Sequence, residues 1–293
     1  MSSYRSPFVH WERTAAVRGF QSEPFDWDMQ GLWVPPGHLA LVPNAEFTEL
    51  LSGPAGAALM LGHLHFTARL ERELIAPVCS RLASGYWLEG AGLAEDALRL
   101  QCDESYHALV CLQLASGVRA QANIEQPLFG EPRFLRRVRE LREAAGGCIS
   151  PEDLNFAAAV VSETIVTRTL GEDWRDPTVR GPIRSFLKMH HLDEARHGAF
   201  FSQALRLAWR SWNEETRSGV ESVWDDLVEG FAGPDLEMMA VAFEAGGVDY
   251  SRAAEILEAL ETESDRVAAT ADTRLTRRAL SAAQAGAGLG VAA

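Results

Sequence analysis

The sequence predicts an all-α protein built around a four-helix bundle, and three observations lead to that prediction. Apolar residues recur at intervals of three and four over long segments, which is the period of an amphipathic helix. No segment is typical of a β-strand. The four longest helical segments also form two consecutive pairs, as in a bundle: 54–84 with 92–118, and 150–170 with 180–211.

The segments outside these pairs are expected to cover the bundle. Residues 1–45 lack a sustained helical period and contain three tryptophans and the pair Pro35–Pro36, which favours an N-terminal arm wrapped over the body. Residues 133–145 form a short amphipathic segment whose apolar residues are expected to point inward. Ser150, Pro151, Glu152 and Asp153 are typical of a helix start.

The C-terminal third is predicted to add further helices, over 212–280, to a metal-binding bundle at 54–211. Helical stretches are expected near 214–230, 234–243 and 250–278, and the small residues of 281–293 favour a flexible tail. Together these segments predict one domain over residues 1–293.

Composition narrows the class of protein. A chain of 293 residues with 47% hydrophobic residues can bury a large core, and its net charge of −14 disfavours nucleic acid and anionic membranes as partners. No apolar run approaches the roughly 18 to 20 residues of a membrane span, and the first residues lack a signal-peptide pattern. We therefore expect a cytoplasmic protein whose cysteines, at positions 79, 102, 111 and 148, are reduced.

A short motif, Asp-Glu-x-x-His, occurs twice on the predicted bundle helices. The first copy contains Asp103, Glu104 and His107, and the second contains Asp193, Glu194 and His197. A glutamate and a histidine three residues apart point the same way from a helix, so each helix can offer both groups to one metal ion. One such pair alone is common on surface helices, but both copies here lie in apolar segments.

Each motif helix is preceded by a helix that carries a glutamate in apolar surroundings. In the second half this residue is Glu163. In the first half the candidates are Glu71 and Glu73, and Glu71 is preferred because its helical neighbours are more apolar.

This set of side chains suits a dinuclear metal site. Bundles of this kind combine one carboxylate from each of two helices with a Glu-x-x-His pair from each of the other two. Four carboxylates balance two divalent ions, and oxygen and imidazole donors without thiolates suit iron or manganese. Asp103 and Asp193 are candidates to accept hydrogen bonds from the ligating histidines, although solvated aspartates would fit the sequence nearly as well.

An additional histidine extends the second motif. At about 100° per residue, His190, Glu194 and His197 fall within roughly 60° of one another on one helix face, whereas His191 lies outside that arc. Only His190 can therefore join the cluster without unwinding the helix.

The full set resembles the p-aminobenzoate N-oxygenase family of arylamine oxygenases, among the ferritin-like dinuclear iron proteins. The resemblance rests on the pattern His-x-x-x-Glu-x-x-His at 190–197 and covers roughly residues 55–210. It implies a ferritin-like bundle in which Glu104 and Glu194 bridge the metals. One metal would be held by Glu71, Glu104 and His107, and the other by Glu163, Glu194, His197 and His190.

The resemblance also implies a reaction. Two irons per chain would activate O2 through a peroxo species and oxygenate a small amine, foremost an arylamine, toward a hydroxylamine or nitro product. The partners would be this amine, O2 and an external electron donor, and a homodimer is expected. Three alternatives stay open at this point: a dinuclear iron oxidase that attacks a C–H bond, a ferroxidase or iron-storage protein, and a helical scaffold whose buried acids and histidines pair with one another.

Overall fold

The protein is described here by a computed structural model. It describes residues 4–19, 27, 30–35, 45–88, 91–145, 148–262 and 273–288. Within these ranges the only β pairing is an isolated bridge between Leu32 and Val179, so the all-α prediction is confirmed. Among the same residues, every helix is too short or too polar to cross a bilayer.

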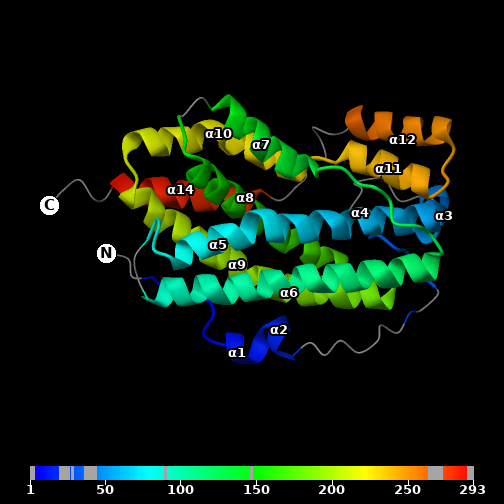
Figure 1. Cartoon of the computed structure of the whole chain (residues 1–293), viewed down its shortest axis with the longest axis horizontal. Helices are drawn as coiled ribbons and strands as arrows, with labels where there is room; N and C mark the ends of the chain where they lie inside the picture. The colour runs from blue at the N-terminus through cyan, green and yellow to red at the C-terminus, as the bar shows by residue number, and fades with distance from the viewer. Residues whose placement is uncertain are drawn as a thin grey trace.

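Four long rods form the bundle (Figure 1). The first consists of α4 (Pro54–Leu70), a π-helical turn η2 (Glu71–Ile75) and α5 (Ala76–Ala83), which follow one another without a break. The other three are α6 (Ala91–Ala122), α8 (Pro151–Asp173) and α9 (Gly181–Ser211). Helices α4 and α5 pack on α6, and α8 packs mainly on α9, which confirms the predicted pairing.

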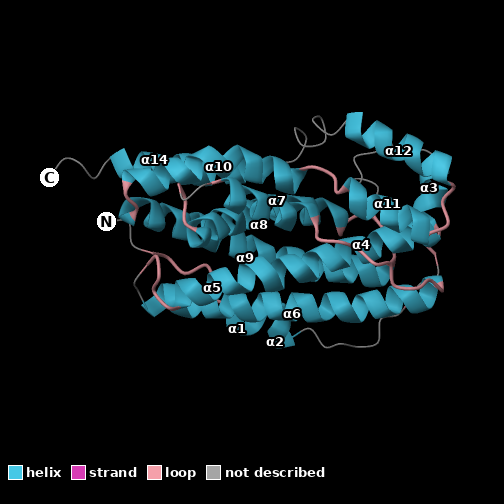
Figure 2. Ribbon diagram, turned by 45° about the horizontal axis from the view of Figure 1, so that its top comes forward, coloured by secondary structure: helices cyan, strands magenta, loops and turns pink. Residues whose placement is uncertain are grey.

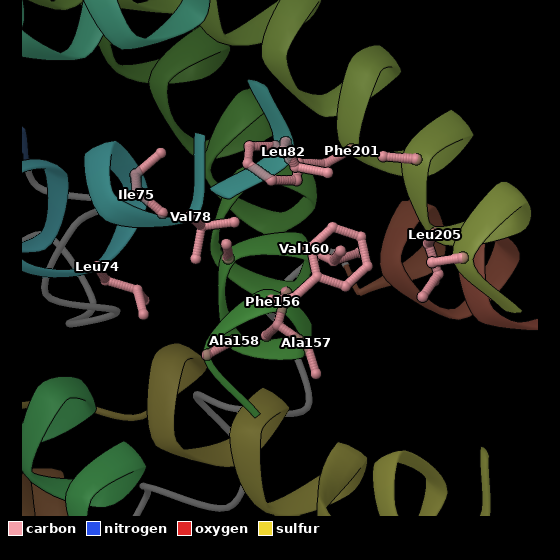
Figure 3. Close-up of a cluster of buried hydrophobic side chains, with 14 of the residues drawn as sticks. Leu74, Ile75, Val78, Leu82, Phe156, Ala157, Ala158, Val160, Phe201 and Leu205 are labelled. Atoms are coloured by element: carbon pink, nitrogen blue, oxygen red, sulfur yellow. The ribbon is translucent and has the colours of Figure 1, made fainter. Parts of the chain in front are cut away.

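The part of the bundle core next to η2 and α5 is apolar. Figure 3 shows side chains from η2 and α5 meeting side chains from α8 and α9. Burial of such side chains stabilises the fold by roughly 1.5 to 3 kcal/mol each. The labelled side chains of this cluster include Leu74, Ile75, Val78, Leu82, Phe156, Val160, Phe201 and Leu205.

The expected start of α8 is present. The backbone N–H of Asp153 donates to the Ser150 hydroxyl at 3.0 Å, and that hydroxyl donates to the Asp153 carboxylate at 2.6 Å. These two bonds form a cap that satisfies a backbone donor in the first turn. Pro151 at the first helical position loses nothing, because its nitrogen would have no helical partner there.

Additional helices cover the bundle, as Figure 2 shows. Helix α7 packs against α8 and α10, and α11 packs against α4. The apolar residues of α7 that were expected to point inward are buried: Phe134, Leu135, Val138 and Leu141. Helix α3, which the sequence did not predict, leads into α4. The bounds are α3 Ala45–Ser52, α7 Arg133–Ala144, α10 Glu214–Ala232, α11 Leu236–Ala245 and α12 Tyr250–Thr262.

The C-terminal prediction is wrong in part. In the described part of the stretch expected near 250–278, α12 covers Tyr250–Thr262 and α14 (Arg274–Gly288) begins at Arg274. Residues 281–288 continue α14, so they are helical and do not belong to a flexible tail. Ala279 and Ala283 are buried, and α14 packs against α9 and α8. Small residues four apart lie on one helix face and let two backbones approach closely. Residues 263–272 and 289–293 lie outside the described residues.

The N-terminal arm lies against the bundle. Its short helices α1 (Trp11–Thr14) and α2 (Ala16–Gly19) lie beside α6 in Figure 1, and Phe8 and Trp11 are buried in the core. Farther along, the backbone of Leu32 bonds to Thr178 and Arg180 just before α9 begins. Pro36 of the expected arm lies outside the described residues.

Candidate metal centre

Seven buried side chains meet in the middle of the bundle, in two adjoining groups. The first group combines Glu71, His107 and His190, and the second combines Glu104, Glu163, Glu194 and His197. Within each group one potential donor atom per residue lies within 4.8 Å of every other. The structure therefore brings together all seven residues that the sequence singled out, from η2, α6, α8 and α9.

The structure places Glu71, and not Glu73, in this cluster. The Glu71 side chain is 3% exposed, whereas that of Glu73 is 40% exposed and accepts two hydrogen bonds from Arg69, at 2.7 and 2.8 Å. The preference for Glu71 from its apolar neighbours thus agrees with the packing. Glu73 serves as a surface residue of the same helix.

Glu71 begins the π-helical turn. The Ala76 N–H bonds to the Glu71 carbonyl, five residues back instead of four. Pro77 explains this widening. In a regular α-helix its nitrogen would have no N–H to donate to the Glu73 carbonyl, and its ring would clash with that same carbonyl oxygen. The turn therefore has a sequence signal, a proline six residues after Glu71, which the helical period alone did not reveal.

Two glutamates face both groups. The Glu104 Oε1 atom lies 2.8 Å from Nδ1 of His197, and its Oε2 atom lies 3.4 Å from Nδ1 of His107. Oε1 of Glu194 lies 2.8 Å from Nε2 of His190 and 3.5 Å from Nδ1 of His197. Both carboxylates therefore lie between the two groups, where the resemblance implies bridging ligands.

His190 lies nearer the first group than the resemblance suggested. The resemblance implies that His190 would hold the same metal as Glu163 and His197, whereas its side chain groups with those of Glu71 and His107. The rings of His190 and His107 have centroids 4.5 Å apart, and Nε2 of His190 lies 3.3 Å from Oε1 of Glu71. His190 lies one turn before Glu194 along α9, and at that level the helix faces the first group.

The two aspartates support the histidines crosswise. His197 Nε2 lies 3.2 Å from Oδ2 of Asp103, and His107 Nε2 lies 3.0 Å from Oδ2 of Asp193. A buried carboxylate only accepts, so each imidazole donates its Nε2–H and turns Nδ1 toward the centre. Both aspartates are fully buried, which rules out the solvated alternative.

Arg196 is a residue of the site that the motif pattern did not single out. Its guanidinium forms an ion pair with Asp193, and Nη2 of the same guanidinium lies 3.9 Å from Oδ2 of Asp103. Two buried aspartates need a nearby cation, because an isolated buried charge is costly. The signal was present in the second motif, where Arg196 follows Asp193 by three residues on the same helix.

The donor set fits two metal ions. Both carboxylate oxygens of Glu71, Oε1 of Glu104 and Nδ1 of His197 are buried without a hydrogen bond of acceptable geometry. Buried polar atoms nearly always have partners, and ligation would provide them here. In the described part of the chain, Nδ1 of His190 also has no hydrogen-bond partner. This third imidazole therefore lacks an aspartate behind it of the kind that orients His107 and His197.

Burial and mutual contact shift the pKa values of these groups. Burial raises the pKa of Glu71 to about 7 and that of Glu163 well above its usual value. Burial alone would lower the pKa of His190, but the Glu194 and Glu71 carboxylates outweigh this and raise it to about 9. Without metal, the centre therefore holds protons at neutral pH.

We expect metal binding to tighten as the pH rises. Glu71, with its pKa of about 7, and His190, with its pKa of about 9, must each lose a proton before binding a cation. Because both pKa values are raised, protons compete with the metal for these side chains below about pH 7 and pH 9, and the metal affinity falls as the solution becomes more acidic. Titration with Mn²⁺ between pH 6 and 8 should show affinity rising about tenfold per pH unit for each proton released. A flat profile would contradict this account.

The bundle and its two buried carboxylate–histidine groups place the protein in the ferritin-like class of helical proteins. Within that class the chain belongs to one family: residues 63–281 match the family model described as P-aminobenzoate N-oxygenase AurF. This family consists of dinuclear iron oxygenases. No protein of curated function matches the chain.

Proposed function

We propose that the protein is a dinuclear iron oxygenase that adds oxygen to the nitrogen of a small primary amine, foremost an arylamine. The first oxygenation step has the balance R–NH2 + O2 + 2e⁻ + 2H⁺ → R–NHOH + H2O, and further oxidation of the hydroxylamine leads toward the nitro compound. The electrons come from an external donor. The residues that would hold the two irons are Glu71, Glu104, His107, Glu163, His190, Glu194 and His197.

One observation carries this proposal: a third imidazole, His190, is buried among the donors. A ferroxidase has no evident use for it, and a scaffold without metal would leave both oxygens of Glu71 buried and without hydrogen bonds. Nε2 of His190 lies 2.8 Å from Glu194 and 3.3 Å from Glu71, so the imidazole can add a neutral ligand to the first metal position. The family match supports the same reaction.

The chain's own residues would prepare the centre for this chemistry. Bound iron would supply the electron transfer to O2, and four carboxylates would balance the charge of two Fe²⁺ ions. Asp103 and Asp193 hold their histidine rings in one orientation, with Nδ1 directed inward. Burial of all seven donors keeps bulk water away from the reacting atoms.

The test is turnover by iron-loaded, reduced protein. Mixed with ¹⁸O2 and a panel of small amines, it should give hydroxylamine or nitro products that carry ¹⁸O, as measured by mass spectrometry. Metal-free protein serves as the control and should give none. The proposal fails if no amine is oxidised, and oxidation of a C–H substrate or accumulation of ferric mineral would point to the corresponding alternative.

A further inference from the structure

We propose that the N-terminal arm completes the metal centre, with Trp11 as a positioning residue for His197. The inference rests on the proposed metal centre. The family match begins at residue 63, so the arm lies outside the matched region. Trp11 is 92 residues away from Asp103 in the sequence, and nothing in the motifs predicted their contact.

The central contact is a shared hydrogen bond. The indole N–H of Trp11 lies 2.9 Å from Oδ1 and 2.9 Å from Oδ2 of Asp103. Oδ2 of Asp103 also accepts from His197, at 3.2 Å. A chain of contacts therefore runs from the arm through Asp103 to His197, whose Nδ1 faces Glu104 at 2.8 Å.

The arm contacts the centre at two further points. Phe8 stacks on the His197 ring, with centroids 6.2 Å apart and planes 22° apart. The backbone N–H of Ala16 donates to Oδ2 of Asp193 at 3.3 Å, and this same oxygen accepts from His107. The arm thus contacts both aspartates that support ligand histidines.

Independent contacts fix the arm at its start. The Tyr4 hydroxyl donates to the buried Asp96 at 2.6 Å. The backbone of Arg5 exchanges hydrogen bonds with the Gln203 side chain, at 3.1 and 2.9 Å. These contacts bind the arm to α6 and α9, which carry the two motifs.

The indole controls the plane of the Asp103 carboxylate. A rigid ring with a directional N–H, shared between both oxygens, holds the carboxylate in one orientation. Without that donor, the hydrogen bond from His197 would have to hold the Asp103 carboxylate against the attraction of Arg196, whose Nη2 lies 3.9 Å from Oδ2 of Asp103. The carboxylate would turn toward the cation, and the His197 ring would lose the acceptor that aims Nδ1 at the metal.

A similar pair elsewhere in the chain provides the control. Trp87 is buried like Trp11, and its N–H donates to Asp153 at 2.8 Å. That aspartate belongs to the cap of α8 and is not one of the acceptors of the metal centre. Loss of its indole donor should affect folding stability alone.

Three variants separate hydrogen bonding from packing. Trp11→Phe keeps an aromatic ring and removes the donor. Trp11→His loses more bulk but places Nε2 the same number of bonds from Cβ as the indole nitrogen, so the donor can be retained. Trp87→Phe removes a matched donor remote from the centre.

The measurement is a titration of each metal-free protein with Co²⁺, followed by its d–d absorbance. In Trp11→Phe, the Kd of one of the two ions should rise about tenfold with an altered spectrum, while the other Kd stays at the parent value. Trp11→His should keep both affinities near those of the parent even if it unfolds at a lower temperature. Trp87→Phe should change neither Kd.

Three results would overturn the proposal, and they can be told apart. If the parent binds two Co²⁺ ions and Trp11→Phe binds both equally well, with equal losses of Tm in the metal-free and loaded forms, Trp11 only supports the fold. The same conclusion follows if Trp11→His loses affinity as much as Trp11→Phe. If the parent binds fewer than two ions, the metal centre itself is refuted and this inference falls with it.

Discussion

His190→Ala will leave a folded, metal-binding protein that has lost most of its oxygenase activity. Removal of one imidazole leaves six of the seven donor residues, among them Glu104 and Glu194, which face both groups. Loss of the hydrogen-bond partner of a metal ligand typically lowers activity or metal affinity by about 10- to 100-fold. Loss of a ligand itself should therefore lower product formation by about 100-fold. Iron content, circular dichroism, the absorption spectrum of the iron protein and product yield measure these effects.

His191→Ala is the matched control, because the two histidines are neighbours on α9 and differ by about 100° in direction. His191 is only partly buried and belongs to neither donor group. Its alanine variant should keep the parent spectrum and yield. If instead His191→Ala abolishes activity while His190→Ala resembles the parent, the assignment of the third imidazole is wrong.

Glu104→Gln should reduce the metal content from two ions per chain to fewer than one. Glu104 faces His197 with one oxygen and His107 with the other, so both metal positions lose a carboxylate at once. Glutamine has nearly the same shape, which limits the loss of packing. Elemental analysis after anaerobic reconstitution with Fe²⁺ gives the stoichiometry, and the parent should approach two equivalents.

Glu73→Gln provides the comparison for Glu104→Gln, since it removes the same charge from a surface position that pairs with Arg69. It should retain two irons. A parent protein that saturates at zero or one iron would contradict the dinuclear centre. Retention of two irons by Glu104→Gln would show that this carboxylate does not bridge.

The sequence predicted much of the bundle because its signals are local. Helical period and the cap at Ser150 placed the long helices within a few residues, and a three-residue spacing directs Glu194 and His197 to one side of α9. Apolar surroundings distinguished Glu71 from Glu73. Each of these inferences depends only on residues within about two helical turns of one another along the chain.

Contacts that depend on tertiary packing could not be predicted from local spacing. His190 groups with Glu71 and His107 because of the level at which α9 packs in the bundle, which helical phase does not determine. The second half of α14 consists mostly of small residues, a composition that the sequence alone assigned to a tail, although it packs against α9. Trp11 reaches Asp103 only through tertiary packing of the arm.

The crossed hydrogen bonds also determine the register of α6 against α9. Asp103 pairs with His197 and His107 with Asp193, so the two helices run antiparallel with matching four-residue steps. A slip of one turn in one direction would set His107 opposite His197 and Asp103 opposite Phe201. A slip in the other would set Asp103 opposite Asp193 and His107 opposite Met189. Either slip places like groups together, and two adjacent carboxylates cannot both stay ionised cheaply. The arrangement that supports the histidines therefore also excludes the neighbouring alignments of the two helices.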